Sequence, residues 1–335
     1  MRTLTLISLI LVTSQLVLAE NQDHTCTGIS GWELEDVTGC MHPRHEATFV
    51  ECEGKFYLLG GRRIQPVDAY DPGTGEWEAL AAPPIELHHF QAISREGKIW
   101  VIGAMTGKYP NETPVPHMYI FEPGKNEWTV GPEIPVERRR SGGGVVEHEG
   151  MIYLVAGIQR GHMGGFVPWL DRWNPTTGEW EVLPDAPHAR DHFQAVIIEG
   201  KIYSAGGRQT SRETDELFSR TVAEVDVYDI ASGGWATLEL PLPTPRAGTS
   251  SAVVDGCLLV AGGESGTQKL AHDEVEVYSP ESGEWYDWPA LQRGRHGSAV
   301  INYKGKLYTC SGSGNRGGRP ELSSIESLVL GKKAD

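Results

Sequence analysis

The chain has too few basic side chains to suit most nucleic-acid-binding proteins. Its 335 residues include 29 Lys and Arg against 45 Asp and Glu, which gives a formal net charge of −16 at pH 7. Because nucleic acids and anionic lipid surfaces repel an acidic protein, neither a nucleic acid nor a membrane is an expected partner.

Several common catalytic and metal-binding motifs are also missing. The sequence contains no Gly-x-Ser-x-Gly elbow, no paired Cys-x-x-Cys and no phosphate-binding glycine loop between a strand and a helix. No short spacing of histidines with an acidic residue marks a metal site. The sequence therefore assigns no metal ligands and identifies no cofactor.

Long apolar runs are absent beyond the N-terminus. Residues 4–18 form a predominantly apolar run without charged residues that follows Arg2, and Val17-Leu18-Ala19 offers small residues at the −3 and −1 positions of a cleavage point. This pattern is typical of a secretory signal peptide and is too short for a membrane-spanning helix. We expect residues 1–19 to be removed, leaving a short segment 20–29, and the mature protein to be secreted or periplasmic.

A tryptophan that follows glycine or glutamate recurs along the rest of the chain. The repeated core is seen most fully in Gly178-Glu179-Trp180-Glu181-Val182-Leu183, and its tryptophans lie 50 to 55 residues apart. They are Trp77, Trp128, Trp180, Trp235 and Trp285. A fixed period of this size indicates a repeat architecture.

In each repeat a short apolar strand upstream of the tryptophan ends in small residues, as in Leu58-Leu59-Gly60-Gly61. We call these small residues the corner of the repeat. Between corner and tryptophan lies an alternating strand that ends in an aromatic residue, such as Val225-Asp226-Val227-Tyr228. Tight turns such as Glu53-Gly54-Lys55 precede the corners. Turns of this kind join antiparallel strands, so each repeat predicts a four-stranded antiparallel meander.

These residues resemble the kelch repeat, whose pattern is a double glycine, then a tyrosine, then a tryptophan at this period. The resemblance covers about residues 30–330 and implies an all-β fold, a six-bladed β-propeller. Because no tryptophan strand follows the sixth corner, and Ser30-Gly31-Trp32 matches Ser232-Gly233-Gly234-Trp235, we expect the N-terminal strand to complete the last blade. The propeller then spans 30–331, with a tail at 332–335.

Five cysteines remain in this export-bound chain, so at least one has no partner within it. Cys26 and Cys40 bracket the closing strand, and we predict a disulfide between them in an oxidising compartment. Cys52, Cys257 and Cys310 fall within strand patterns and are expected to be buried.

The candidate site lies where the innermost strands begin, because these positions surround one mouth of a propeller's channel. Aligning the blades on the turn before each corner brings arginines and histidines into register around this mouth. The residues predicted to bind a ligand there are Arg44, His45, His88, Arg140, Arg190, Arg246, Arg295 and His296, together with Trp169.

Two blades share a His-Phe-Gln-Ala segment that the other four lack, beginning at His89 and His192. An imidazole can accept a proton near neutral pH, so we predict these two as catalytic groups, with Tyr109 from a loop on the same face. The loops facing this mouth add further cationic and aromatic residues, among them Arg62, Arg63, Arg160, His162, Arg208, Arg316 and Arg319. Arginine's planar guanidinium suits carboxylate, sulfate and phosphate groups.

Three functions remain open at this point. The leading hypothesis is a protein that engages an anionic saccharide, or another small acidic ligand, as a binding protein or as a lyase or epimerase; resemblance to exported kelch proteins of those types supports it. The second is a protein-interaction module without catalysis. The third is a metal-dependent oxidase, because copper radical oxidases also use kelch blades, although no matching tyrosine–cysteine pair is found.

Overall fold

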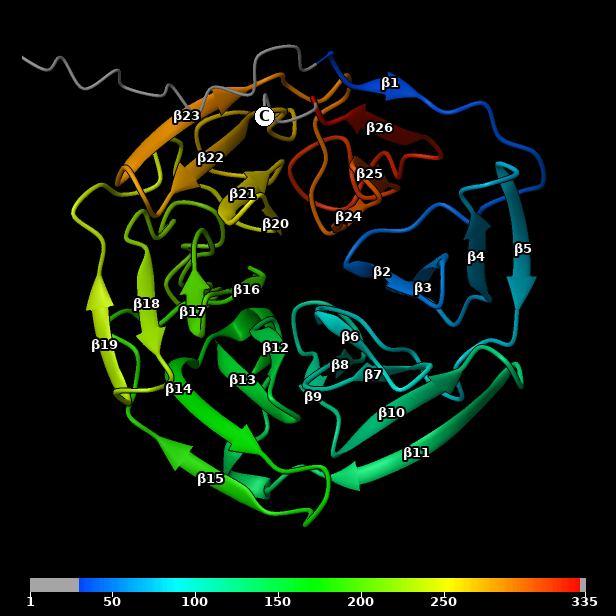
Figure 1. The fold of residues 1–335 in the computed structure, drawn as a ribbon. Coiled ribbons are helices and arrows are strands. Elements are labelled where there is room, and N and C mark those ends of the chain that lie inside the picture. The colour runs from blue at the N-terminus through cyan, green and yellow to red at the C-terminus, as the bar shows by residue number, and fades with distance from the viewer. Residues whose placement is uncertain (1–29, 332–335) are drawn as a thin grey trace, which may run out of the picture.

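Short strands are the main regular elements of the structure, a computed structural model that describes residues 30–331. The predicted signal peptide, segment 20–29 and tail 332–335 lie outside the described residues. Six four-stranded antiparallel sheets form a ring around a central axis (Figure 1), which confirms the predicted six-bladed propeller. No helix in the described part of the chain has the length and apolar character needed to cross a membrane.

The first three sheets follow the chain in order from the axis outward (Figure 1). Their strands are β2 (Ala47–Cys52), β3 (Lys55–Gly60), β4 (Val67–Asp71) and β5 (Glu76–Leu80); then β6 (Ala92–Arg95), β7 (Lys98–Val101), β10 (His117–Glu122) and β11 (Glu127–Glu133); then β12 (Gly144–His148), β13 (Met151–Ile158), β14 (Phe166–Trp173) and β15 (Trp180–Leu183).

The next two sheets repeat this order, and the sixth takes its outer strand from the other end of the chain. Their strands are β16 (Ala195–Ile198), β17 (Lys201–Ser204), β18 (Asp226–Asp229) and β19 (Gly234–Thr237); then β20 (Ser250–Val254), β21 (Cys257–Ala261), β22 (Val275–Ser279) and β23 (Glu284–Trp288); then β24 (Val300–Tyr303), β25 (Lys306–Cys310), β26 (Ile325–Val329) and β1 (Glu33–Leu34). Minor elements are the hairpin β8 (Met105–Thr106) and β9 (Thr113–Pro114) and the 3-10 turns η1 (Val136–Arg138) and η2 (Gly161–Met163).

Strand β1 closes the ring, as the sequence predicted. It pairs antiparallel with β26, with Glu33 opposite Ser327 and Leu34 opposite Glu326. The preceding Trp32 is only 2% exposed, and its indole N–H donates to the carbonyl of Pro289, 3.0 Å away. This pairing covers the outer edge of β26 with a strand from the start of the chain.

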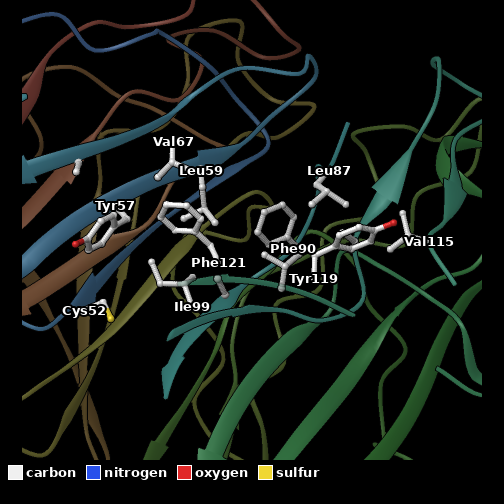
Figure 2. Packing of buried hydrophobic residues seen from close by; sticks show 14 residues of the cluster. Cys52, Tyr57, Leu59, Val67, Leu87, Phe90, Ile99, Val115, Tyr119 and Phe121 are labelled. Atoms are coloured by element: carbon white, nitrogen blue, oxygen red, sulfur yellow. The ribbon is translucent and has the colours of Figure 1, made fainter. Parts of the chain in front are cut away.

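The hydrophobic core lies between neighbouring sheets. In the cluster between the first two blades, Tyr57 and Leu59 of β3 pack near Phe121 of β10 and Phe90 (Figure 2). Equivalent clusters join the other sheets in pairs. Because each sheet is packed on both faces, the innermost strands are held in fixed positions around the axis.

Two of the three cysteines expected to be buried are buried in the structure. Cys52 and Cys310 are buried, as predicted, whereas Cys257 at the start of β21 is only partly buried. Cys40 is exposed, and its predicted partner Cys26 lies outside the described residues, so that disulfide stays a prediction.

Candidate functional site

A closed circle of backbone hydrogen bonds surrounds the mouth of the channel. It runs through the third residue of the aligned segments, just before each innermost strand begins. Each N–H in this circle donates to the carbonyl of the preceding blade: His89 to Glu46, Gly142 to His89, His192 to Gly142, Gly248 to His192, Gly297 to Gly248, and Ala47 to Gly297. Residues about 50 positions apart in the sequence are therefore neighbours, as the alignment of the blades required.

The residues in this circle adopt a left-handed backbone conformation. Three blades place glycine there, Gly142, Gly248 and Gly297, with φ between 64° and 65°. The other three place Glu46, His89 and His192 there, with φ of 54°, 54° and 57°. A side chain in this conformation costs about 1–3 kcal/mol and persists where the surroundings or the function require it. The chain thus carries three polar side chains where the backbone favours glycine.

This strain gives a direct prediction for His192. Replacing it with glycine should give a protein about 1 kcal/mol more stable than replacing it with alanine, because glycine adopts this φ without strain. At His117 on β10, an ordinary strand position, the alanine variant should instead be the more stable. Urea unfolding of all four variants measures both differences. The same order at the two positions would contradict the strain.

The two predicted catalytic histidines lie together, and a third histidine joins them. The ring centroids of His89 and His192 are 4.8 Å apart, and that of His162 in η2 lies 5.1 Å from each. All three are buried. One ring nitrogen of each lies within 4.8 Å of the other two. We call these three residues the histidine cluster. The Tyr109 ring, half exposed, lies 5.1 Å from His162.

Each imidazole of the cluster is held by a hydrogen bond through Nδ1. His192 Nδ1 contacts the carboxylate of the neighbouring Asp191, and His162 Nδ1 lies 3.1 Å from both oxygens of Glu112. His89 Nδ1 lies 2.6 Å from Nδ1 of His88. The Nδ1 atom of each of the three rings therefore has a hydrogen-bond partner.

Among residues 30–331, the Nε2 atoms of His89 and His192 have no hydrogen-bond partner, although both side chains are only 1% exposed. The nearest carboxylate to His89 Nε2 is Glu46 Oε2, 3.3 Å away. Buried polar atoms without partners are rare in folded proteins and call for an explanation. Here they mark a place where a ligand atom would complete the structure.

Burial sets the protonation of these groups. Burial, reinforced by the neighbouring His88, holds the pKa of His89 well below its usual value, and burial also lowers the pKa of His162. Burial likewise lowers the pKa of His88 to about 4. Burial alone would raise the pKa of Glu46, but the imidazoles of His192, His296 and His45 lower it to about 2. At neutral pH the centre thus holds neutral His89 and His162 beside an ionised Glu46.

The predicted ligand-binding arginines do not face the channel, which corrects the sequence analysis. Their guanidinium groups are buried and pair with a carboxylate on the third strand of the same blade: Arg44 with Asp68, Arg140 with Asp171, Arg190 with Asp226, Arg246 with Glu276 and Arg295 with Glu326. Backbone carbonyls accept further hydrogen bonds from them, as Gly206 and Glu224 do from Arg190. Each of these arginines thus links the segment before the innermost strand to the third strand of the same blade.

The second blade shows that the pairing belongs to the architecture. It has Leu87 in place of the arginine and Tyr119 in place of the carboxylate. The two partners are therefore present or absent together, because a buried charge without its partner is strongly destabilising.

The other predicted ligand-binding residues differ in their surroundings. His45 lines a pocket and bonds Glu321 through Nδ1, whereas His88 is completely buried behind His89. His296 Nε2 lies 2.6 Å from the carbonyl of Gly317 and 3.3 Å from Glu264 Oε2. The ring of Trp169 is covered by the guanidinium of Arg138, which lies 4.1 Å from the ring centroid.

A pocket of about 550 Å³ opens between the first and sixth blades. It is lined by His45, Arg62, Arg63, Arg316, Gly318, Arg319 and Glu321, which we call the rim pocket. Arg62 connects the two features, because it bonds the same Glu112 that holds His162. Arg63 pairs with Glu321, and neither Arg316 nor Arg319 forms an ion pair with any other residue between 30 and 331.

Sequence reasoning missed the residues that support the cluster. Glu112 and His162 lie in loops of irregular length, for which the repeat gives no register. Asp191 is aligned with the other blades beside His192, and Glu264 follows the fifth corner, but no sequence pattern indicates a role for either residue. The buried pair between Arg208 and Glu264 is a further example.

The comparisons with known proteins agree with the fold. A family model described as the Attractin/LZTR1 beta-propeller matches residues 25–270. Kelch-like protein terF of Aspergillus terreus is 29% identical over 81% of this chain and 61% of its own length. Human Kelch-like protein 38 is 26% identical over 76% of this chain and 42% of its own length. The chain thus spans less than two thirds of these relatives.

A solved structure titled "Structure of YjhT" superposes with a TM-score of 0.72. It shares 16% sequence identity, and the match covers 86% of this chain and 95% of that one. At this identity the likeness establishes the propeller fold alone.

Proposed function

The chain belongs to the Attractin/LZTR1 β-propeller family, a kelch-type propeller, and from the arginines at its channel mouth we propose that it binds a small anionic ligand there. The rim pocket carries the proposal, because four of its seven lining residues are arginines in a chain of net charge −16. Two of these arginines have no acidic partner among the described residues. A concave, cationic site on an acidic protein favours anions over other ligands.

An acidic saccharide is the ligand class that we propose. Its carboxylate would bind the planar guanidinium groups of Arg63 and Arg319, and its hydroxyl groups could bond His45 and Glu321. The exposed ring of Tyr109 offers a face for a sugar ring near the cluster.

Lyase or epimerase chemistry would use the histidines as bases. His89 or His192 would take the proton next to the carboxylate of a uronic acid, and Tyr109 would supply a proton to the other side or to the leaving oxygen. Elimination would produce an unsaturated uronate whose conjugated double bond absorbs ultraviolet light. The single variants His89→Ala and His192→Ala should then abolish turnover and remain folded.

Binding of an acidic oligosaccharide tests the proposal. We expect the full chain to bind oligogalacturonate but not a neutral cello-oligosaccharide, with affinity that falls as salt is added. The double variant Arg63→Gln/Arg319→Gln should weaken binding at least 100-fold, since each charged hydrogen bond contributes about 1.5–3 kcal/mol. Arg172→Gln, on the outer part of the third blade, is the matched control. Equal titration curves for the acidic and neutral sugars would refute the proposal.

A protein partner is the second candidate, and one observation favours it. Three large apolar side chains are exposed on loops between the second and third strands of three blades, the loops that face this mouth: Ile64 (58%), Tyr109 (49%) and Leu270 (54%). Such residues at a cationic pocket would suit an acidic peptide with apolar flanks. Tight binding of acidic peptides that is lost on Ile64→Ser and Leu270→Ser, with no binding of sugars, would favour this function.

A further inference from the structure

The histidine cluster has the composition of a metal centre. Its three imidazoles come from separate parts of the chain: His89 before β6, His162 in η2 and His192 before β16. One nitrogen from each lies within 4.8 Å of the others. We propose that His89, His162 and His192 bind one divalent transition-metal ion at the mouth of the channel. This site goes beyond the proposed binding of an anionic ligand and does not depend on it.

The hydrogen bonds around the cluster fix the ring tautomers that a metal requires. A carboxylate only accepts, so Asp191 and Glu112 place the protons of His192 and His162 on Nδ1 and leave Nε2 with a free lone pair. Metal-binding histidines usually donate their other N–H to a carboxylate or carbonyl in this way.

His89 reaches the same state through its neighbour. The His88 Nε2 faces the carbonyl of Gly107 at 3.4 Å, an acceptor, so His88 carries its proton on Nε2 and accepts at Nδ1. His89 then donates from Nδ1 to His88 and keeps its Nε2 lone pair free. Three independent contacts thus leave the corresponding nitrogen of each ring available.

The free nitrogens are a second observation that points to a ligand. Nε2 of His89 and of His192 is buried and has no hydrogen-bond partner in the part of the chain that the structure describes. Both residues also occupy left-handed positions where three other blades use glycine. The chain thus keeps two strained residues, each with an unsatisfied nitrogen, at one point on the axis. A bound metal ion would satisfy both atoms.

The donor set and its surroundings select the kind of ion. Neutral imidazoles suit Zn²⁺, Cu²⁺, Co²⁺ and Fe²⁺ better than Mg²⁺ or Ca²⁺, which prefer oxygen. Ligand nitrogens about 2.1 Å from a tetrahedral ion lie about 3.4 Å apart, so the rings must approach one another by roughly 1 Å on binding. The carboxylates of Glu46, Glu112 and Asp191 offset the ion's charge.

A three-histidine centre leaves coordination positions for further ligands. Within the described chain no other imidazole belongs to this group. An ion here would occupy the lone pairs of His89 and His192 and replace their role as bases.

Metal titration of the chelator-treated full chain tests the site. We expect calorimetry with ZnCl₂ and with CuCl₂ to show one saturable site per chain. The variants His89→Ala, His162→Ala and His192→Ala should each weaken binding at least 100-fold, and His117→Ala should leave it unchanged. Asp191→Asn, which alters a positioning residue, should weaken binding about 10- to 100-fold. Binding of Co²⁺ should produce a visible absorption band that the three ligand variants lose.

The glycine variants His89→Gly and His192→Gly guard against loss of folding, since the backbone favours glycine at both positions. Both should retain the circular dichroism of the parent chain and lose the metal. Absence of saturable binding by the parent would overturn the proposal. So would binding that persists in all the folded ligand variants, because the ion would then lie elsewhere. Neither result would alter oligogalacturonate binding in the rim pocket, so the two proposals can fail separately.

Discussion

Replacing Arg190 with methionine is expected to lower the free energy of unfolding by about 3–5 kcal/mol, the usual effect of removing one partner from a buried ion pair. The Arg190 guanidinium lies 2.7 Å from Asp226, and neither side chain is exposed. Without the arginine, the Asp226 carboxylate would keep only His188 and Thr237 as side-chain hydrogen-bond partners. The carbonyls of Gly206 and Glu224 would also lose a donor.

Arg172→Met is the control for this effect. Arg172 pairs with Glu181 on the surface of the third blade, where both side chains are well exposed. Exposed ion pairs contribute little, so this change should alter stability by less than about 0.5–1 kcal/mol. Urea unfolding followed by tryptophan fluorescence compares the two variants. Equal midpoints would show that Arg190 does not brace the blade, and the ligand-binding role predicted from sequence would be reconsidered.

Truncating Trp32 to alanine is expected to destabilise the protein by about 3–5 kcal/mol, as for other buried tryptophans. Its ring packs in the cluster that joins the fifth and sixth blades, with Leu291 and Leu328 among its neighbours. The variant would lose the hydrogen bond to Pro289 as well as the packing. Because Trp32 precedes β1, its loss should loosen the seam of the ring.

Leu34→Ala tests whether that effect is specific to the buried tryptophan. Leu34 lies two residues further along in β1 and is 59% exposed, so its truncation should change stability by less than about 0.5 kcal/mol. Hydrogen exchange of β26 should rise in Trp32→Ala and stay unchanged in Leu34→Ala. Similar stability of the two variants would mean that closure by β1 adds little to the fold.

The architecture could be predicted from sequence because the repeat itself fixes it. The six small-residue corners predicted the number of blades, and the tryptophan at position 32 indicated the closing strand. The same spacing placed His89 and His192 at equivalent positions in two blades. Residues in equivalent positions meet at the axis of a propeller, and these two do so at a ring distance of 4.8 Å.

The direction of side chains was harder to predict. The aligned arginines precede the innermost strands as expected. Their side chains point into their own blades, however, because each pairs with a carboxylate on the third strand. The sequence holds this signal in the joint absence of both partners from the second blade, at Leu87 and Tyr119. His162 and Glu112 could not be placed, because they lie in loops whose lengths differ from blade to blade.

The proposed metal centre of this propeller lies where His89, His162 and His192 meet. Anomalous diffraction at the zinc edge, from crystals of the full chain grown with ZnCl₂, tests this site most directly. We expect one strong anomalous peak within coordination distance of all three imidazoles. A fully loaded crystal with no peak among these residues, or with zinc only at other sites, would contradict it.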